Sequence, residues 1–275
     1  MPRLTCIMLA LMLLPATPAA AQVSTNARVS NVAANAAIGA IIAAARQVLG
    51  GHHFIRPLVL GALGGAIQGA GRQVAAGRST ASGLVGREVS VLGISVTYSA
   101  GADSLVLIAP VWLLTIEVRP HQQNRFRARV NLMDFAFVTS ALIDGRSLDV
   151  ASSLVAGAPV FTRPIAPTDV ELGYTRMGVI FLMNGTPPAL RREALSHEAV
   201  HLLQWDAYNQ LVANPIERTL VRAVPGGGSL SRFLDLGVLS VTSALLLAQQ
   251  IAYDQQPWER EAYLLTTGRP TAGPR

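Results

Sequence analysis

The chain of 275 residues is 51% hydrophobic and only 14% charged, which is apolar for a soluble protein. Its length supports one large domain or two small ones. The formal net charge of +6 is the difference between 22 basic and 16 acidic residues, and the basic residues are all arginine and mostly scattered. Because they form no long basic run, we expect no nucleic-acid partner and relate the charge to attraction toward an anionic membrane surface.

Residues 1–21 have the pattern of an export signal. A positive charge at Arg3 precedes the apolar residues 4–14, a stretch of about 11 residues that is too short for a membrane span. Small residues at 19–21 fit a cleavage site, so we expect a periplasmic or secreted protein, with membrane association as a further option. The single cysteine, Cys6, would leave with the signal. Any metal site in the mature chain therefore needs His and carboxylate ligands.

Residues 22–86 are rich in alanine and glycine and are predicted to form a helical hairpin, with helices over residues 29–49 and 57–76. Small residues recur every fourth position on each helix and share one face: Ala36, Ala40 and Ala44, then Gly61, Gly65 and Gly69. Such faces let two backbones approach closely. We expect a tight hairpin in a soluble domain, with a hairpin in or on a membrane as the alternative.

Residues 87–186 are predicted to be β-rich and to form an antiparallel sheet. The candidate strands, rich in β-branched and apolar residues, are 89–98, 105–119, 125–143 and 179–183. Arg125, Arg127 and Arg129 alternate, so that on a strand they share one face, which we expect to be solvated.

Residues 187–268 are predicted to be helical, and the Pro- and Gly-rich tail 269–275 to be disordered. Two prolines at 187 and 188 open a helix that runs to about Val212. Residues 234–251 form an apolar helix whose polar residues favour a buried core position over a membrane span. The expected fold class is therefore α+β, with helices at both ends of the chain.

The sequence His-Glu-Ala-Val-His, which begins at His197, has the spacing of a metal-binding motif. Positions i and i+4 share a helix face, so His197 and His201 can bind one zinc ion, with Glu198 beside it as general base. A catalytic zinc site needs a third protein ligand. The best downstream context is a proline-started helix with Glu259 and Glu261 in its first turn.

Together these motifs resemble those of the gluzincin group of zinc metallopeptidases, over residues 197–263. The resemblance implies that the two histidines are zinc ligands and that Glu198 is the general base. It implies that Glu259, the first acid of Glu-x-Glu-Ala, is the third ligand. Glu261 is the fallback, because the two acids point about 200° apart on a helix and cannot both face the ion.

The chain departs from the family pattern at Tyr263, where an aspartate often orients a histidine. The orienting hydrogen bond must then come from elsewhere, or Tyr263 has another role. Gln204 and Trp205, one turn after the second histidine, are expected to serve packing. Residues 178–184 are expected to form a strand before the motif helix, as an ordinary core strand or as the edge strand that pairs with substrate in gluzincins.

The resemblance implies an exported zinc-dependent hydrolase, and within that class a metallopeptidase acting on a peptide or protein substrate. Tyr263, Tyr253 and Tyr208 are candidates to stabilise the oxyanion. The small-residue hairpin also fits a second hypothesis, a non-catalytic envelope or membrane-associated protein with a structural or vestigial metal site. A serine hydrolase is disfavoured, because Ser196 and the adjacent His197 point about 100° apart on a helix.

Overall fold

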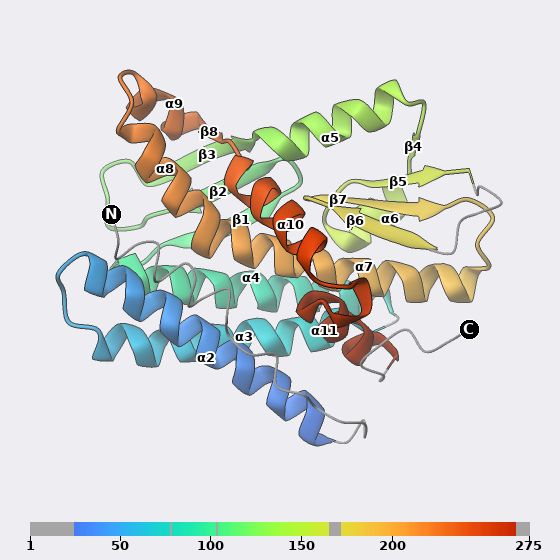
Figure 1. Cartoon of the computed structure of the whole chain (residues 1–275), viewed down its shortest axis with the longest axis horizontal. Helices are drawn as coiled ribbons and strands as arrows, with labels where there is room; N and C mark the ends of the chain where they lie inside the picture. Colours follow the sequence, from blue (N-terminus) through green and yellow to red (C-terminus); the bar gives the residue numbers. More distant parts are fainter. Residues whose placement is uncertain (1–24, 78, 103, 165–171, 268–275) are drawn as a thin grey trace.

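The computed structural model describes residues 25–77, 79–102, 104–164 and 172–267 (Figure 1). The predicted signal at residues 1–21 and the predicted tail at 269–275 lie outside the described residues. Helices and two small sheets share the described part, so the expected α+β class is confirmed.

The N-terminal part forms three long helices rather than two: α2 (Thr25–Leu49), α3 (Ile55–Ala75) and α4 (Thr80–Ala102). The strand predicted over residues 89–98 is wrong, because these residues lie inside α4. Tertiary packing overrides their β-branched composition. A Cβ added to Gly93 would lie 2.5 Å from the backbone nitrogen of Gln68, so α4 touches α3 backbone to backbone.

The predicted glycines of α3, Gly61 and Gly65, do contact α2 closely, but on α2 they meet Gly39 and Ala43, one position before the predicted Ala40 and Ala44. A Cβ added to Gly39 of α2 would lie 2.9 Å from the Cα of Gly65 in α3. Glycines on two faces of α3 thus let α2 and α4 approach it closely. Within α2, Arg28–Leu49 is long and apolar enough to cross a membrane by length and composition alone, and it is the one such helix among the described residues.

The first sheet has the strand order β1-β2-β3-β8. Its strands are β1 (Leu107–Val111), β2 (Leu114–Val118), β3 (Phe126–Asn131) and β8 (Leu234–Asp235). The strand predicted over 125–143 ends at Asn131, and α5 (Leu132–Ile143) follows at once. β8 comes from the C-terminal half of the chain and runs parallel to β3, so the sheet is mixed rather than antiparallel.

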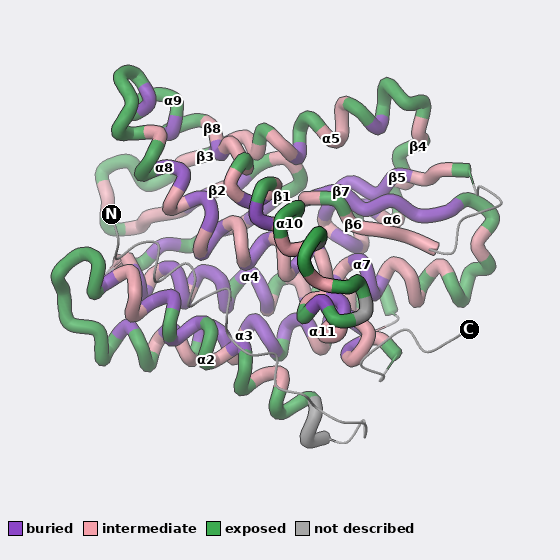
Figure 2. Tube along the Cα trace, viewed as in Figure 1, coloured by how far each residue is buried: buried purple, intermediate pink, exposed green. Residues whose placement is uncertain are grey.

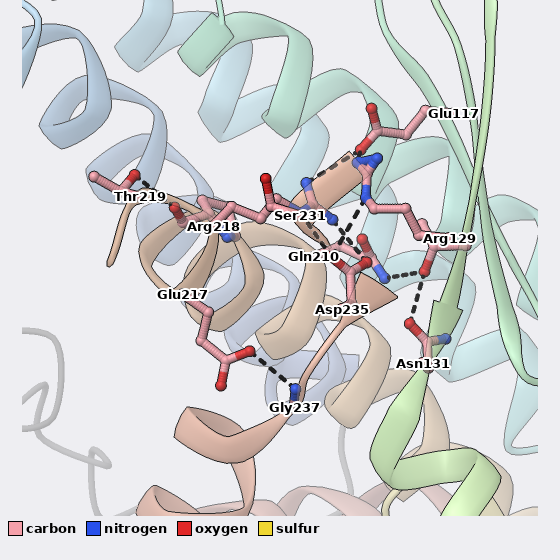
Figure 3. A network of polar contacts seen from close by, with 12 residues as sticks. Glu117, Arg129, Asn131, Gln210, Glu217, Arg218, Thr219, Ser231, Asp235 and Gly237 are labelled. Carbon is pink, nitrogen blue, oxygen red and sulfur yellow. Dashed lines mark hydrogen bonds and ion pairs between the residues drawn. The ribbon is translucent and has the colours of Figure 1, made fainter. Parts of the chain in front are cut away.

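One face of this sheet is lined by charges that are buried under α8 (Asn214–Arg222) (Figure 3). Arg129 is buried and pairs with Glu117 and with Asp235, and Arg218 of α8 pairs with the same two carboxylates. The solvated face predicted for the alternating arginines is therefore wrong for Arg129, because acids from β2 and β8 neutralise its charge inside the protein.

The second sheet has the order β4-β5-β7-β6. Its strands are β4 (Ser147–Leu148), β5 (Val160–Arg163), β6 (Gly173–Arg176) and β7 (Val179–Met183), with α6 (Val150–Ala156) between the first two. β7 is paired on both sides and all five residues are buried, so the edge-strand alternative for 178–184 is wrong and the core-strand reading holds. Among the described residues, β6 ends the sheet.

The C-terminal helices carry the metal-binding motif. After α7 (Pro188–Tyr208) a π-helical turn, η1 (Asn209–Ala213), leads directly into α8. The remaining elements are α9 (Gly227–Phe233), α10 (Val238–Gln250), η2 (Tyr253–Gln255) and α11 (Pro257–Thr267).

The buried position predicted for residues 234–251 is wrong for much of α10. Its inner face is polar, because Ser240 bonds Asn209 and Ser243 bonds Tyr208. Two of its four leucines point outward, with Leu245 57% and Leu246 53% exposed, and Leu239 and Leu247 are half-buried. The hydrogen bonds of the two serines turn the polar face of α10 toward the protein, and this orientation leaves Leu245 and Leu246 in solvent.

Candidate metal centre

His197 and His201 of α7 meet Glu259 of α11 in one buried cluster. The Oε2 atom of Glu259 lies 3.5 Å from Nε2 of His197 and 3.3 Å from Nε2 of His201. The two Nε2 atoms are 3.1 Å apart. Three ligand atoms, all within 4.8 Å of one another, can hold a metal ion.

The local sequence explains this convergence. The i, i+4 spacing puts both imidazoles on one face of α7. Pro257 begins α11 and places Glu259 in its first turn, and α11 packs against α7 through a cluster that contains Val200 and Ala262. Sequence reasoning thus named the three residues that the fold brings together.

Charge in the cluster is strongly coupled. Burial opposes ionisation of Glu259, but the two imidazoles close to its carboxylate lower its pKa to about 2. Burial likewise opposes protonation of His201, but the nearby carboxylates of Glu259 and Glu198 raise its pKa to about 9. Oε2 of Glu259 is buried and has no hydrogen-bond partner of normal geometry, as expected for an atom directed toward a cation.

Gln204 orients the second histidine, a role beyond the packing expected for it. Its amide nitrogen donates to Oε2 of Glu261 at 2.8 Å and to the carbonyl of Trp258 at 3.1 Å. Its amide oxygen is therefore free to accept from Nδ1 of His201, at 2.9 Å. This contact aims Nε2 of His201 at Glu259 and supplies the orienting bond that the departure at Tyr263 required.

The first histidine is held differently. The ring of Tyr263 lies 4.5 Å from the ring of His197, centroid to centroid, so Tyr263 packs on the imidazole. The hydroxyl of Thr266 lies 3.5 Å from Nδ1 of the same histidine. Thr266 carried no recognisable signal in the sequence, because its position depends on the last turn of α11 reaching α7.

Glu261 points away from the cluster, as the two-residue offset on a helix requires. Its carboxylate accepts hydrogen bonds from Arg72 at 3.1 Å and from Asn31 at 2.9 Å, in addition to Gln204. Arg72 is buried in α3 and Asn31 lies in α2. Glu261 thus connects the N-terminal helices to Gln204 and is not the third ligand in this arrangement.

Glu198 is buried on the side of α7 that faces β6. Thr175 of β6 donates to Oε2 of Glu198 at 2.8 Å. Burial raises the pKa of Glu198, against the opposing charges of the two histidines. A carboxylate with a raised pKa next to a cation-binding cluster suits proton transfer.

The remaining candidates lie differently. The hydroxyl of Tyr208 is bonded to Ser243 of α10 at 2.8 Å, two turns of α7 beyond His201. Tyr253 hydrogen-bonds to Glu259 and lowers its pKa. The hydroxyl of Ser196 donates to the carbonyls of Gly77 and Arg192, so it serves helix packing. Tyr253 and Tyr263 therefore remain as the tyrosines beside the cluster.

No protein-family model, no curated protein and no solved structure matches the chain.

Proposed function

We propose that the chain is an exported zinc-dependent hydrolase, and specifically a metallopeptidase. The observation that carries the proposal is the approach of Glu259 to both histidines, with the Glu198 carboxylate buried beside them. Two imidazoles and one carboxylate form the donor set of a catalytic zinc site, which keeps its fourth position for water or substrate. A chain without cysteine in this region offers no competing thiolate site.

A zinc ion held here would supply a bound water of lowered pKa and polarise a carbonyl. Glu198 takes the proton of the attacking water and passes it to the leaving amine. Thr175 holds this carboxylate through Oε2 and leaves Oε1 for the proton. Tyr253 and Tyr263 are the nearest candidates to donate a hydrogen bond to the oxyanion.

β6 supports a peptide as the substrate. It ends the second sheet among the described residues, and its Thr175 donates a hydrogen bond to Glu198. A Cβ added to Gly173 would lie 3.4 Å from Cγ of Glu198, so the strand backbone runs close to the proposed base. An extended peptide that adds to this edge would bring its amide groups along the centre.

The decisive experiment compares Glu198→Gln with the wild type. We expect Glu198→Gln to keep one zinc per chain and to lose peptidase activity by about 10²–10⁴-fold, because the ligands stay and the base is removed. Zinc is measured by mass spectrometry on protein purified without chelator, and activity with a peptide library. Glu259→Ala should lose both zinc and activity. Undiminished hydrolysis by Glu198→Gln would refute its role.

A second candidate is a structural metal site in a non-catalytic envelope protein. The exposed fractions of His197, Glu198 and Glu259 are only 9%, 5% and 7%, and structural zinc sites are closed whereas catalytic sites keep an open position. In that case zinc removal would lower the melting temperature, and no peptide would be cleaved by zinc-loaded protein. Cleavage that depends on Glu198 decides for the enzyme.

A further inference from the structure

Arginines without acidic partners gather at one end of the molecule. Arg127 of β3, Arg222 of α8 and Arg232 of α9 come from three elements that pack together. Arg222 donates to the hydroxyl of Ser231, the residue before Arg232, at 3.3 Å. Partial burial and the charges of Arg119, Arg222 and Arg232 lower the pKa of Arg127, as expected where cations crowd together.

The nearby carboxylates are already engaged elsewhere (Figure 3). Glu117 and Asp235 neutralise the buried Arg129 and Arg218. Glu217 accepts hydrogen bonds from the backbone nitrogens of Gly237 and Leu239. In the part of the chain that the structure describes, no carboxylate pairs with the three arginines. Their charge is therefore directed to solvent or to an external anion.

Exposed aromatic side chains stand next to two of these cations in the sequence. Phe126 precedes Arg127 and is 73% exposed, and Phe233 follows Arg232 and is 67% exposed. Three more exposed apolar residues complete the set: Leu220 of α8, Val224 in the connection that follows it, and Leu230 of α9. Large apolar groups this exposed, interleaved with cations, mark an interaction surface rather than a solvated one.

The loop between α2 and α3 lies toward the same end of the long axis as the β2–β3 connection and α9 (Figure 1). It is exposed, as is most of α9 (Figure 2). Ile55 is 71% exposed, and Phe54 and Leu49 are also exposed. Segments from three parts of the chain thus bring apolar side chains to one end of the molecule.

We propose that this end of the molecule binds peripherally to an anionic lipid bilayer. It is called the basic end and is defined by Phe126, Arg127, Arg222, Arg232 and Phe233. The arginines contact lipid phosphates, and the apolar side chains enter the boundary between headgroups and acyl chains. The aliphatic side chains favour a bilayer over a nucleic acid, because bases stack on aromatic rings and gain little from leucine or valine.

The test is cosedimentation of the full chain with lipid vesicles. We expect binding to vesicles of phosphatidylcholine with 30% phosphatidylglycerol and little binding to phosphatidylcholine alone. Arg222→Glu/Arg232→Glu should lower the partition coefficient on the anionic vesicles by about tenfold or more, because each arginine near an anionic surface adds to the free energy of binding. Phe126→Ser/Phe233→Ser should weaken binding and make the remainder more sensitive to salt.

The matched control is Arg28→Glu/Arg192→Glu, which makes the same change of net charge at exposed arginines outside the basic end. It should keep most of the binding. Equal binding to both vesicle types, or equal losses in the two double variants, would overturn the proposal. So would binding to single-stranded nucleic acid in place of vesicles. Zinc content and circular dichroism of each variant show whether it is folded.

Discussion

At the scale of single residues, the protonation of His201 determines how the proposed zinc site would respond to pH. Its pKa is raised to about 9, whereas that of Glu259 is lowered to about 2. Near neutral pH, the metal-free cluster therefore pairs a protonated imidazole with an ionised carboxylate. A metal ion must displace the proton on Nε2, since ligands bind metals in their deprotonated form.

We expect zinc binding at pH 7 to release about one proton per chain, and the apparent affinity to rise with pH until about pH 9. Calorimetry in buffers of different ionisation enthalpy measures the number of protons released. The same measurement at about pH 9 is the comparison, because His201 is then about half deprotonated before zinc binds and the release should fall. A release that is zero at pH 7 would contradict the raised pKa.

The residues of the cluster could be predicted from sequence because their spacing is local. His197, His201 and Glu198 follow from one helical motif, and Glu259 from the first turn of another helix. The role of Gln204 could not be predicted. It depends on Glu261, whose position is set by Arg72 far away in the chain.

At the scale of elements, local composition predicted the helices better than the strands. α7 and α11 carry clear start signals at their prolines and were found where expected. α4 was misread, because its valines and threonine suit a strand. As a helix it packs closely along α3, with Gly86 and Gly93 in contact with the α3 backbone, and no local pattern reveals this packing. The parallel pairing of β8 with β3 is equally non-local.

α7 also contains a buried acid outside the metal centre. Burial raises the pKa of Asp206 to about 7, partly opposed by the charge of Arg87 from α4 and reinforced by Asp134 of α5. The folded state thus binds a proton that the unfolded state has lost above about pH 4. Stability from this group is present at low pH and is lost as the pH rises through about 7.

We expect Asp206→Asn to be close to neutral near pH 4 and to stabilise the protein at pH 8, by an amount on the order of 2–4 kcal/mol. Urea unfolding at the two pH values measures the difference. Asp144→Asn, at an exposed position, is the control for the change of charge. Destabilisation by Asp206→Asn at pH 8 would mean that the carboxylate is ionised and stabilised by Arg87.

At the scale of the whole molecule, a chain of polar contacts connects the N-terminal helices to the candidate metal centre. Arg72 of α3 pairs with Glu261 at 3.1 Å, and both side chains are largely buried. Glu261 in turn holds Gln204, which orients His201. The close packing of α2 and α3 therefore holds the charge of Arg72 in place beside Glu261 of α11. The N-terminal hairpin thus supports the hydrogen bonds that orient His201, in addition to its packing.

Arg72→Met should leave Glu261 buried without its cation, at a cost of about 3–5 kcal/mol in unfolding free energy. If the variant is folded, zinc affinity should also fall by about 10–100-fold, because the support of His201 is loosened. Affinity is measured by competition with a chromophoric chelator. The double variant Arg72→Met/Glu261→Gln should recover much of the stability, since no buried charge remains unpaired.

Glu88→Gln, which breaks an exposed ion pair with Arg87, should change stability by less than about 0.5 kcal/mol. Unchanged zinc affinity in folded Arg72→Met would show that the metal centre is independent of the N-terminal helices.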